Sequence, residues 1–484
     1  MPKSHLLSLL LIGLVIFGLV GCTSLPAGDT TQLRVMTYDK ENRYFNSKYG
    51  DMFHTQNDSI KIDLVRTKSI ELDRNASNYV QALQQSIEQE ELDVLQLSTY
   101  EYKQLSEAGF LLDLEPLVVR DNYNIDTIYP SITHFLREQG SGRLYGFAPT
   151  FQRQAIYYNI DLFEKYRIEQ PHDGMTWQEL INLAEQFPTD GDEQSRIYGG
   201  FDTFGLSQEG HLRNLGLTIG LSMGLKAVNL DIKQATMDTE GWKQAYQQAQ
   251  AALATNSIHK RGHNTDKDFN EQQLFSQGRQ AILIDDPNYV YSELANIGEG
   301  KSGVKSFRVG MVVGPVNHSD REITRDLNLN NDYVYAIRAK SSNVDAAWEL
   351  LKFMQGDEVA GELARRPDNG IPSRMGQTSN FYGINLEGFY HLNSVQQGGY
   401  FDDPKKILAD DFPLKYEEIT YREWALVEKS LKTIDEALQS IQRDLQVALD
   451  EAILSKKMNG ENGEMKTDNG MTIHWDDFKT IPFK

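Results

Sequence analysis

The sequence predicts an α/β fold, and three observations near its start carry this prediction. Apolar and polar residues alternate over 33–38 and again over 60–65, as they do in half-buried strands. Residues 77–91 place apolar side chains at helical spacing, and the apolar segment 92–98 that follows is typical of a buried strand. A strand, a helix and a strand in this order predict a mostly parallel sheet that is covered by helices.

The rest of the chain repeats these signals. Thr176 and Glu179 have the spacing of a capping box, which predicts that a helix begins there. Further apolar strands are expected at 281–284, 309–313 and 333–337, a helix through Trp348 and Phe353, and a final helix over about 428–453 with Leu431 on its apolar face. Gly216, Gly220 and Gly224 recur every fourth residue, a spacing that favours close packing between helices.

Length, charge and cysteine content limit the possible functions. The 484 residues suffice for two or three domains with ample core. A formal net charge of -21 repels phosphate backbones, so nucleic acid is not expected as a partner. Cys22 is the single cysteine, which excludes an internal disulfide and a multi-cysteine zinc or iron–sulfur site. We expect neither a metal nor a cofactor.

The amino terminus has the pattern of a bacterial lipoprotein signal. Residues 6–20 form an apolar stretch that is too short to span a membrane and has the length of a signal-peptide core. Gly21 stands immediately before Cys22, which resembles a lipobox, where cleavage precedes the cysteine and its thiol then carries lipid. We therefore expect removal of residues 1–21 and a tether over 22–32 that holds the protein at the cell membrane, facing outside the cytoplasm. The alternative is an ordinary signal peptide or short anchor with a chance cysteine.

Six short phrases follow one another in an order that is typical of one family. They are 142–149 (GRLYGFAP), 156–163 (IYYNIDLF), 171–180 (PHDGMTWQEL), 275–282 (FSQGRQAI), 346–353 (AAWELLKF) and 370–374 (GIPSR). Together they resemble the extracellular solute-binding proteins of ATP-driven (ABC) importers, in the carbohydrate-binding branch that includes maltose-binding protein. The resemblance covers about residues 33–455.

This resemblance implies two α/β lobes that are joined by crossing strands and close on a solute. By analogy, lobe I comprises 33–147 and 284–341, lobe II comprises 148–283 and 342–455, and 456–484 forms a polar extension. A solute that touches both lobes only in the closed form shifts the population toward closure. The resemblance also implies a non-catalytic monomer that delivers its solute to a membrane permease.

The family's solute site is built from loops that follow strands and crossings. The corresponding candidates here are Asp39, Thr99, Tyr100, Phe151, Gln152, Asp286, Asn288, Tyr289, Asn331, Asp332 and Tyr382. Sugars need aromatic faces for stacking and carboxylate or amide groups for their hydroxyls, and these residue types supply both. Where the family often has a tryptophan, this chain has Asn288 beside Tyr289, so a peptide or polyol stays open as the solute.

Two other functions also stay open. A secreted enzyme acting on glycans would need two carboxylates across a cleft, and adjacent acids such as Asp285 and Asp286 point in opposite directions on an extended chain. A binding module that reports its solute to a sensor would have the same sequence features as a transport protein. The glycine-rich segment 298–303 lacks the strand and helix that a phosphate loop requires, so we interpret it as an exposed turn.

Overall fold

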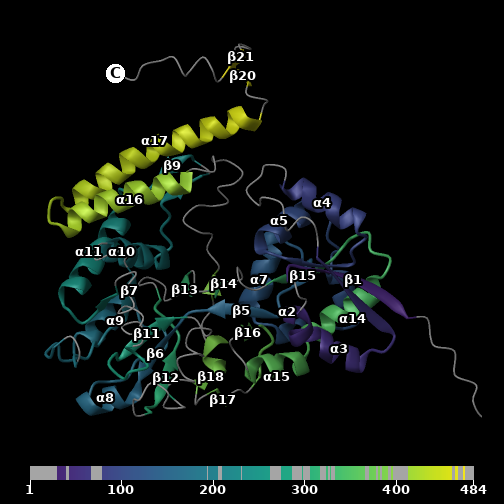
Figure 1. Cartoon of the computed structure of the whole chain (residues 1–484), viewed down its shortest axis with the longest axis horizontal. Coiled ribbons are helices and arrows are strands. Elements are labelled where there is room, and N and C mark those ends of the chain that lie inside the picture. Colours follow the sequence, from purple (N-terminus) through teal and green to yellow (C-terminus); the bar gives the residue numbers. More distant parts are fainter. Residues whose placement is uncertain are drawn as a thin grey trace, which may run out of the picture.

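The computed structural model forms two lobes, which lie on the right and left of Figure 1. It describes residues 30–39, 43–66, 79–192, 195–204, 210–230, 232–261, 274–285, 297, 306–316, 323–324, 327–328, 333–365, 370–377, 380–381, 384–390, 394–395, 412–460, 464–466 and 472–474. Within this part of the chain, none of the helices combines the length and the hydrophobicity that crossing a bilayer requires.

Lobe I is built on a five-stranded sheet with the strand order β2–β1–β3–β15–β4. The strands are β1 (Thr31–Thr37), β2 (Ile60–Arg66), β3 (Val94–Leu97), β4 (Gly146–Phe147) and β15 (Val334–Ile337). β1 pairs in parallel with β2 and β3, whereas β15 runs antiparallel to both β3 and β4. The mostly parallel sheet that the first hundred residues predict is therefore confirmed.

Helices on both sides of this sheet complete lobe I. They are α2 (Arg43–Phe45), the π-helix η1 (Asn46–Gly50), α3 (Asp51–Gln56), α4 (Tyr79–Gln89), α5 (Thr99–Glu107), α6 (Glu115–Arg120), the 3-10 turn η3 (Ile125–Thr127), α7 (Pro130–Gln139), α14 (Val344–Met354) and α15 (Asp357–Arg365). The expected division assigns residues 342–455 to lobe II. The packing of α14 and α15 differs from it. Trp348 and Leu363 of these helices are buried in the core of lobe I, because the chain returns onto the sheet directly after β15.

In the part of the chain that the structure describes, lobe II holds a three-stranded antiparallel sheet with the order β11–β6–β12, and helices lie around it. The elements are β6 (Ala155–Asn159), α8 (Ile160–Tyr166), α9 (Trp177–Ala184), α10 (His211–Ser222), α11 (Glu240–Ala254), β11 (Ile282–Asp285), β12 (Val309–Val312), α16 (Phe412–Glu428) and α17 (Ile434–Gly460). The predicted capping box is confirmed, since the Glu179 amide donates to Thr176 Oγ1 over 3.2 Å and α9 begins there.

Short strand pairs lie outside the main sheets of the two lobes. They are β7 (Asp202–Phe204) with β10 (His259–Arg261), β8 (Val228–Asn229) with β9 (Gln234–Ala235), β13 (Ile323–Thr324) with β19 (Ser394–Val395), β17 (Asn380–Phe381) with β18 (Ile384–Asn385), and β20 (Glu464–Lys466) with β21 (Thr472–His474). The 3-10 helix η5 (Leu386–Tyr390) lies between β18 and β19 in the chain.

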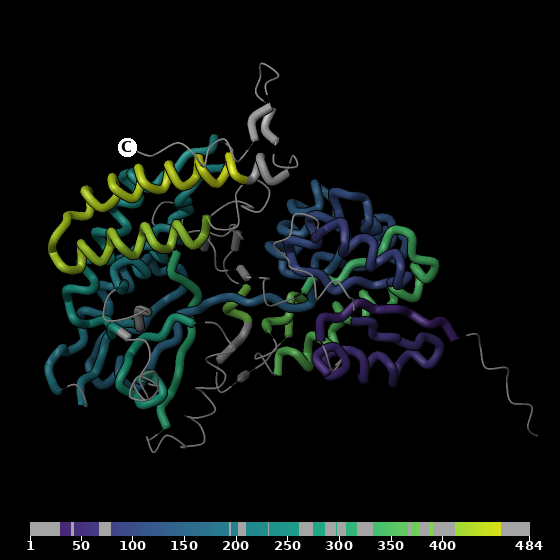
Figure 2. Tube along the Cα trace, turned by 45° about the horizontal axis from the view of Figure 1, so that its top comes forward, coloured from purple at the N-terminus to yellow at the C-terminus, as the bar shows by residue number. Residues whose placement is uncertain are grey.

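Three segments that pass between the lobes pair with one another, and we call them the crossing sheet. β5 (Thr150–Arg153) is its central strand, flanked by β14 (Leu327–Asn328) and β16 (Ile371–Pro372). β5 follows β4 of lobe I and precedes β6 of lobe II, and β14 lies between β12 and β15 in the chain. Figure 2 shows the chain around β5 passing from one lobe to the other.

Gly216 and Gly220 pack two helices of lobe II together, as their spacing predicts, whereas Gly224 lies beyond the end of α10 with a φ of 79°. A Cβ atom on Gly216 would stand 2.1 Å from the ring of Tyr246, and one on Gly220 would stand 2.1 Å from the ring of Trp242. Both rings are fully or almost fully buried on α11, so they have no space to retreat.

We expect Gly220→Ala to lower the free energy of unfolding by about 1–3 kcal/mol, because the added methyl group overpacks a dense core. Urea unfolding of the variant and the parent measures this difference. Gly109→Ala is a poor control because its φ is +70°. Gly361 of α15 has only a side-chain oxygen 3.4 Å from its would-be Cβ, so Gly361→Ala should not destabilise the fold and should raise its stability by up to about 1 kcal/mol. A Gly220→Ala variant as stable as the parent would contradict this account of the α10–α11 contact.

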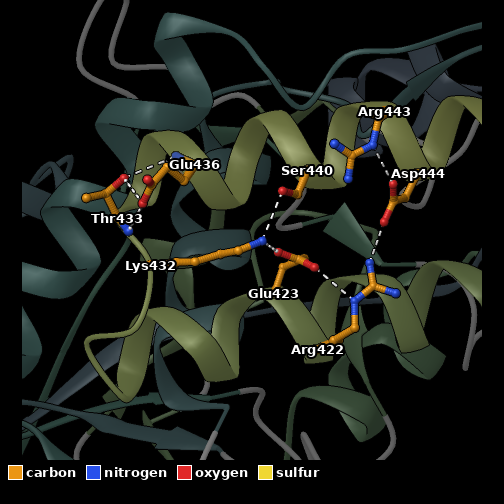
Figure 3. Close-up of polar contacts among 8 residues, drawn as sticks. All are labelled: Arg422, Glu423, Lys432, Thr433, Glu436, Ser440, Arg443 and Asp444. Atoms are coloured by element: carbon orange, nitrogen blue, oxygen red, sulfur yellow. Dashed lines mark hydrogen bonds and ion pairs between the residues drawn. The ribbon is translucent and has the colours of Figure 1, made fainter.

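The predicted helix over 428–453 is wrong at its beginning. Ser430 has a φ of 58°, so the chain turns between α16 and α17, and Leu431 is 69% exposed instead of facing the core. Figure 3 shows that charged side chains close this turn: Lys432 Nζ donates to Glu423 and, over 3.1 Å, to Ser440 Oγ. Arg422 Nε donates to the other oxygen of Glu423 over 2.8 Å.

Candidate functional site

The carboxyl ends of β1, β3 and β4 lie at one edge of the sheet of lobe I, and we call it the carboxyl edge. β15 runs the other way, so its first residues meet the other strands at this same edge. β4 leads from this edge directly into β5 of the crossing sheet. The carboxyl edge therefore lies where the chain crosses to lobe II, the place where open parallel sheets bind ligands.

Tyr38 and Tyr44, which follow β1, and Tyr333, which comes much later in the chain, gather at the carboxyl edge, and we call them the tyrosine cluster. The rings of Tyr38 and Tyr333 stack with their centroids 5.5 Å apart and an angle of 17° between their planes. The ring of Tyr44 meets Tyr333 edge-on, with 6.2 Å between centroids. All three side chains are half-buried, so the cluster presents aromatic surface where β1 ends and β15 begins.

A buried carboxylate holds Tyr38 in place. Glu101 is 1% exposed, and its Oε1 accepts hydrogen bonds from the hydroxyls of Tyr38, over 2.6 Å, and Tyr79. Its Oε2 accepts from the amide and the hydroxyl of Ser98, over 2.7 and 2.8 Å. These bonds join β1, α4 and the start of α5, so Glu101 positions the outer edge of the sheet.

A second buried side chain, that of Gln96, also holds Tyr38 in place. Gln96 Oε1 accepts from the backbone amide of Tyr38 over 3.0 Å, and its Nε2 donates to the hydroxyl of Tyr335 over 3.2 Å. Burial raises the pKa of Tyr335 well above its ordinary value. Tyr335 therefore stays a neutral phenol.

The structure brings three of the predicted site residues to this edge. Asp39 follows β1, and its Oδ2 accepts from the backbone amide of Tyr44 over 2.6 Å, which places Tyr44 beside Tyr333. Thr99 and Tyr100 open α5 directly after Ser98 and are half-buried. Their contact with a solute remains a prediction, but their position at the carboxyl edge agrees with it.

The two predicted residues of β5 differ from each other. Phe151 is fully buried, with its ring centroid 5.4 Å from that of Tyr129 and 6.0 Å from that of Tyr390, so it has no face to offer a solute in this conformation. Gln152 points to the opposite side of the strand and is 5% exposed. Its Oε1 is buried and has no hydrogen-bond partner among the described residues. This oxygen can therefore accept a hydrogen bond from another group.

The other predictions concern residues outside the described part of the chain. They are Asp286, Asn288, Tyr289, Asn331, Asp332, Tyr382 and the lipidation candidate Cys22. The described residues contain no group of three histidine, cysteine, aspartate or glutamate side chains that could hold a metal ion.

Sequence reasoning missed Tyr38, Tyr44, Tyr333 and Glu101. A signal for Glu101 was present, because Ser98 and Glu101 have capping-box spacing directly after the strand over 92–98. No local signal joins the three tyrosines, which come from both ends of lobe I.

Comparison with known proteins gives a family and a fold. Residues 61–361 match the family model described as bacterial extracellular solute-binding protein. The fold is similar to that of the sugar-binding protein MalE from Xanthomonas citri, with a TM-score of 0.60, 14% identity, and 89% of this chain and 100% of that chain covered.

Two further solved structures share the fold. A sugar transporter from Rhizobium etli, in an open conformation, has a TM-score of 0.59 and 17% identity, with 86% of this chain and 99% of that chain covered. An ABC substrate-binding protein from Listeria monocytogenes in complex with cycloalternan has a TM-score of 0.53 and 16% identity, with 87% and 100% covered.

Proposed function

The chain belongs to the bacterial extracellular solute-binding proteins, and we propose that it captures an oligosaccharide for an ATP-driven importer. The observation that carries this proposal is the tyrosine cluster, which lies at the carboxyl edge. Phenol rings offer flat apolar faces for the C–H side of a sugar ring. The names of similar structures, which include a sugar-binding protein and a cycloalternan complex, support the same solute class.

Polar groups around the cluster suit a neutral solute with many hydroxyls. Asp39 and Thr99 add acceptor and donor groups at the carboxyl edge, and the amide of Gln152 adds another on the crossing sheet. Of the predicted residues outside the described part, Asp286, Asn288 and Asp332 have the same chemistry. We propose that these groups bond the solute's hydroxyls while the rings of the tyrosine cluster stack on it.

We further propose that the protein binds its solute without transforming it. The buried carboxylate nearest the tyrosine cluster, Glu101, accepts hydrogen bonds from Tyr38, Tyr79 and Ser98, which leaves it in a supporting role. Capture then depends on differential affinity, because a solute that touches both lobes stabilises the closed arrangement relative to the open one. The importer's permease would receive the solute from that closed form.

A thermal-shift screen tests the solute class. Purified protein is heated with maltose, maltotetraose, a cyclic α-glucan, sorbitol and a tripeptide, each in excess. A sugar at a hundred times its dissociation constant should stabilise the fold by about 2.7 kcal/mol, which a shift in melting temperature reveals. A response to the tripeptide or to sorbitol alone, or recovery of a chemically altered sugar, would contradict the proposal.

We also propose that a lipid on Cys22 anchors the protein to the cell membrane. Cys22→Ala should release the protein into the medium or leave its signal segment uncleaved, because no thiol remains to be acylated. Fractionation of cells and medium, with the mass of the chain measured, distinguishes these forms. Ser24→Ala, two residues away, is the matched control and should stay anchored. Membrane anchoring of a cleaved Cys22→Ala chain would refute the lipid anchor.

A further inference from the structure

The last residue of the central crossing strand is a fully buried arginine. Arg153 ends β5 and is 0% exposed, although its side chain carries a permanent charge. Burying a guanidinium is costly unless its N–H groups find acceptors, so the contacts that surround Arg153 have a structural purpose.

Among its partners in the described part of the chain, Arg153 donates to groups of two other elements. Its Nη1 bonds the backbone carbonyl of Phe389 in η5, and lies 3.4 Å from the hydroxyl of Tyr129, which directly precedes α7. Phe389 and Tyr129 are both buried, in an apolar cluster that covers lobe I and also takes in Ala155 at the start of β6. The carboxyl end of β5 is therefore fixed to η5 and to the start of α7.

The same contacts reach the neighbouring strand of the crossing sheet. Tyr390, next to Phe389, donates its hydroxyl to the carbonyl of Pro372 on β16 over 2.6 Å. The amide of Tyr129 donates to the carbonyl of Ser373, directly after β16, over 2.7 Å. Arg153, η5, β16 and the start of α7 thus form one connected unit, which we call the arginine clamp.

Beyond the clamp, the chain enters lobe II after a single residue. Ala155 begins β6, where it pairs with Asp285 of β11 in the sheet of lobe II. Gln154 stands between the clamped strand and this sheet, and it is exposed while its neighbours on both sides are buried. A change in the angle between the lobes must be absorbed where the chain is least held, and along this crossing that place is Gln154.

We infer that Arg153 is a positioning residue for solute capture, because it clamps β5 to η5 and the start of α7 and so places the bend of this crossing at Gln154. The inference rests on the proposed function, in which the lobes close on a solute. A substitution that weakens the bonds of Arg153 would extend the flexible segment from Gln154 toward Thr150. The lobes of the solute-free protein would then sample a wider range of angles. The clamp thus limits the open arrangements from which closure starts.

The test measures distances between the lobes in the absence of any solute. Spin labels are attached at Gln85→Cys on α4 and Gln250→Cys on α11, two exposed positions, in a chain with Cys22→Ala so that no other thiol is present. Pulsed electron spin resonance then compares the parent with Arg153→Lys, which keeps the charge but loses the planar fork, and with Tyr129→Phe, which removes one acceptor. Gly220→Ala serves as the control for a loss of stability within lobe II alone.

Arg153→Lys should broaden the distribution of interlobe distances most, Tyr129→Phe should broaden it less, and Gly220→Ala should leave it unchanged. An Arg153→Lys distribution that coincides with the parent's overturns the inference. Equal broadening by Gly220→Ala also overturns it, because the effect would then follow stability and not the clamp. If Arg153→Lys does not fold, Tyr129→Phe decides in the same way. Since no solute is used, this result is independent of the thermal-shift screen that tests the proposed function.

Discussion

Replacing Tyr38 or Tyr333 with alanine is expected to weaken solute binding by about thirtyfold or more, because a central aromatic anchor is typically worth about 2 kcal/mol or above. The two rings stack 5.5 Å apart at the carboxyl edge, so each alanine removes one face and loosens the other. Isothermal titration with the sugar that gives the largest thermal shift measures the loss. The same variants should change the midpoint of thermal unfolding only slightly, because both rings are half-buried and not part of the deep core.

A matched control separates binding from general damage. Tyr166 is also a half-buried tyrosine, packed on Phe187 of lobe II with 5.7 Å between ring centroids, and Tyr166→Ala should leave affinity unchanged. Tyr38→Phe keeps the ring but loses the bond to Glu101, so it should bind with an affinity between those of the parent and Tyr38→Ala. Unchanged affinity in both Tyr38→Ala and Tyr333→Ala would remove the tyrosine cluster from the solute site.

Local sequence patterns predicted the parts of the fold that depend on neighbouring residues. The strand at 33–38 and the capping box at Thr176 appear where the sequence places them, because alternation and capping act over a few residues. The glycine repeat also gave the right contact, since it marks the side of α10 where no side chain can stand.

The tyrosine cluster and its support could not be predicted in this way. Tyr38 and Glu101 are 63 positions apart in the chain, and Tyr333 comes from a strand that joins the sheet much later. Only the completed sheet, with β15 antiparallel beside β3, brings them together. Phe151 shows the converse limit, because the sequence predicts its position just past the crossing but not that it lies on a strand with its ring buried.

The division of the lobes fails for a related reason. The expected boundary near residue 342 treats the chain as leaving lobe I after its last strand. The segment beyond β15 instead folds back as α14, whose Trp348 is fully buried against lobe I and donates its indole N–H to Asp121 over 2.8 Å. An amphipathic helix has the same sequence pattern on either lobe, so periodicity alone does not choose between them.

Removing the carboxylate at the centre of the α16–α17 turn is expected to have the largest effect on stability. Glu423 has a side chain that is 5% exposed, and it accepts charge-assisted hydrogen bonds from Arg422 and Lys432. Glu423→Ala leaves both cations without their shared partner, so the free energy of unfolding should fall by about 3 kcal/mol at pH 7. This figure is at the low end for buried pairs, because the Arg422 and Lys432 side chains are 48% and 29% exposed. Urea unfolding of the parent and the variant measures the difference.

The contribution of Glu423 should also depend on pH, and its sign follows from the pKa. Burial pushes the pKa of this carboxyl upward, but the hydrogen bonds from Lys432 and Arg422 outweigh burial, so the pKa lies below its ordinary value. A depressed pKa stabilises the fold above the unfolded value of about 4.3, and that stabilisation is lost as the pH falls through the folded value. The parent and Glu423→Ala should therefore converge in stability as the pH is lowered toward 3. Glu451→Ala removes a pair between the same two helices whose carboxylate is 58% exposed, and it should change stability by no more than about 0.5 kcal/mol at either pH. A Glu423→Ala deficit that persists undiminished at low pH would assign the loss to packing and not to the charge network.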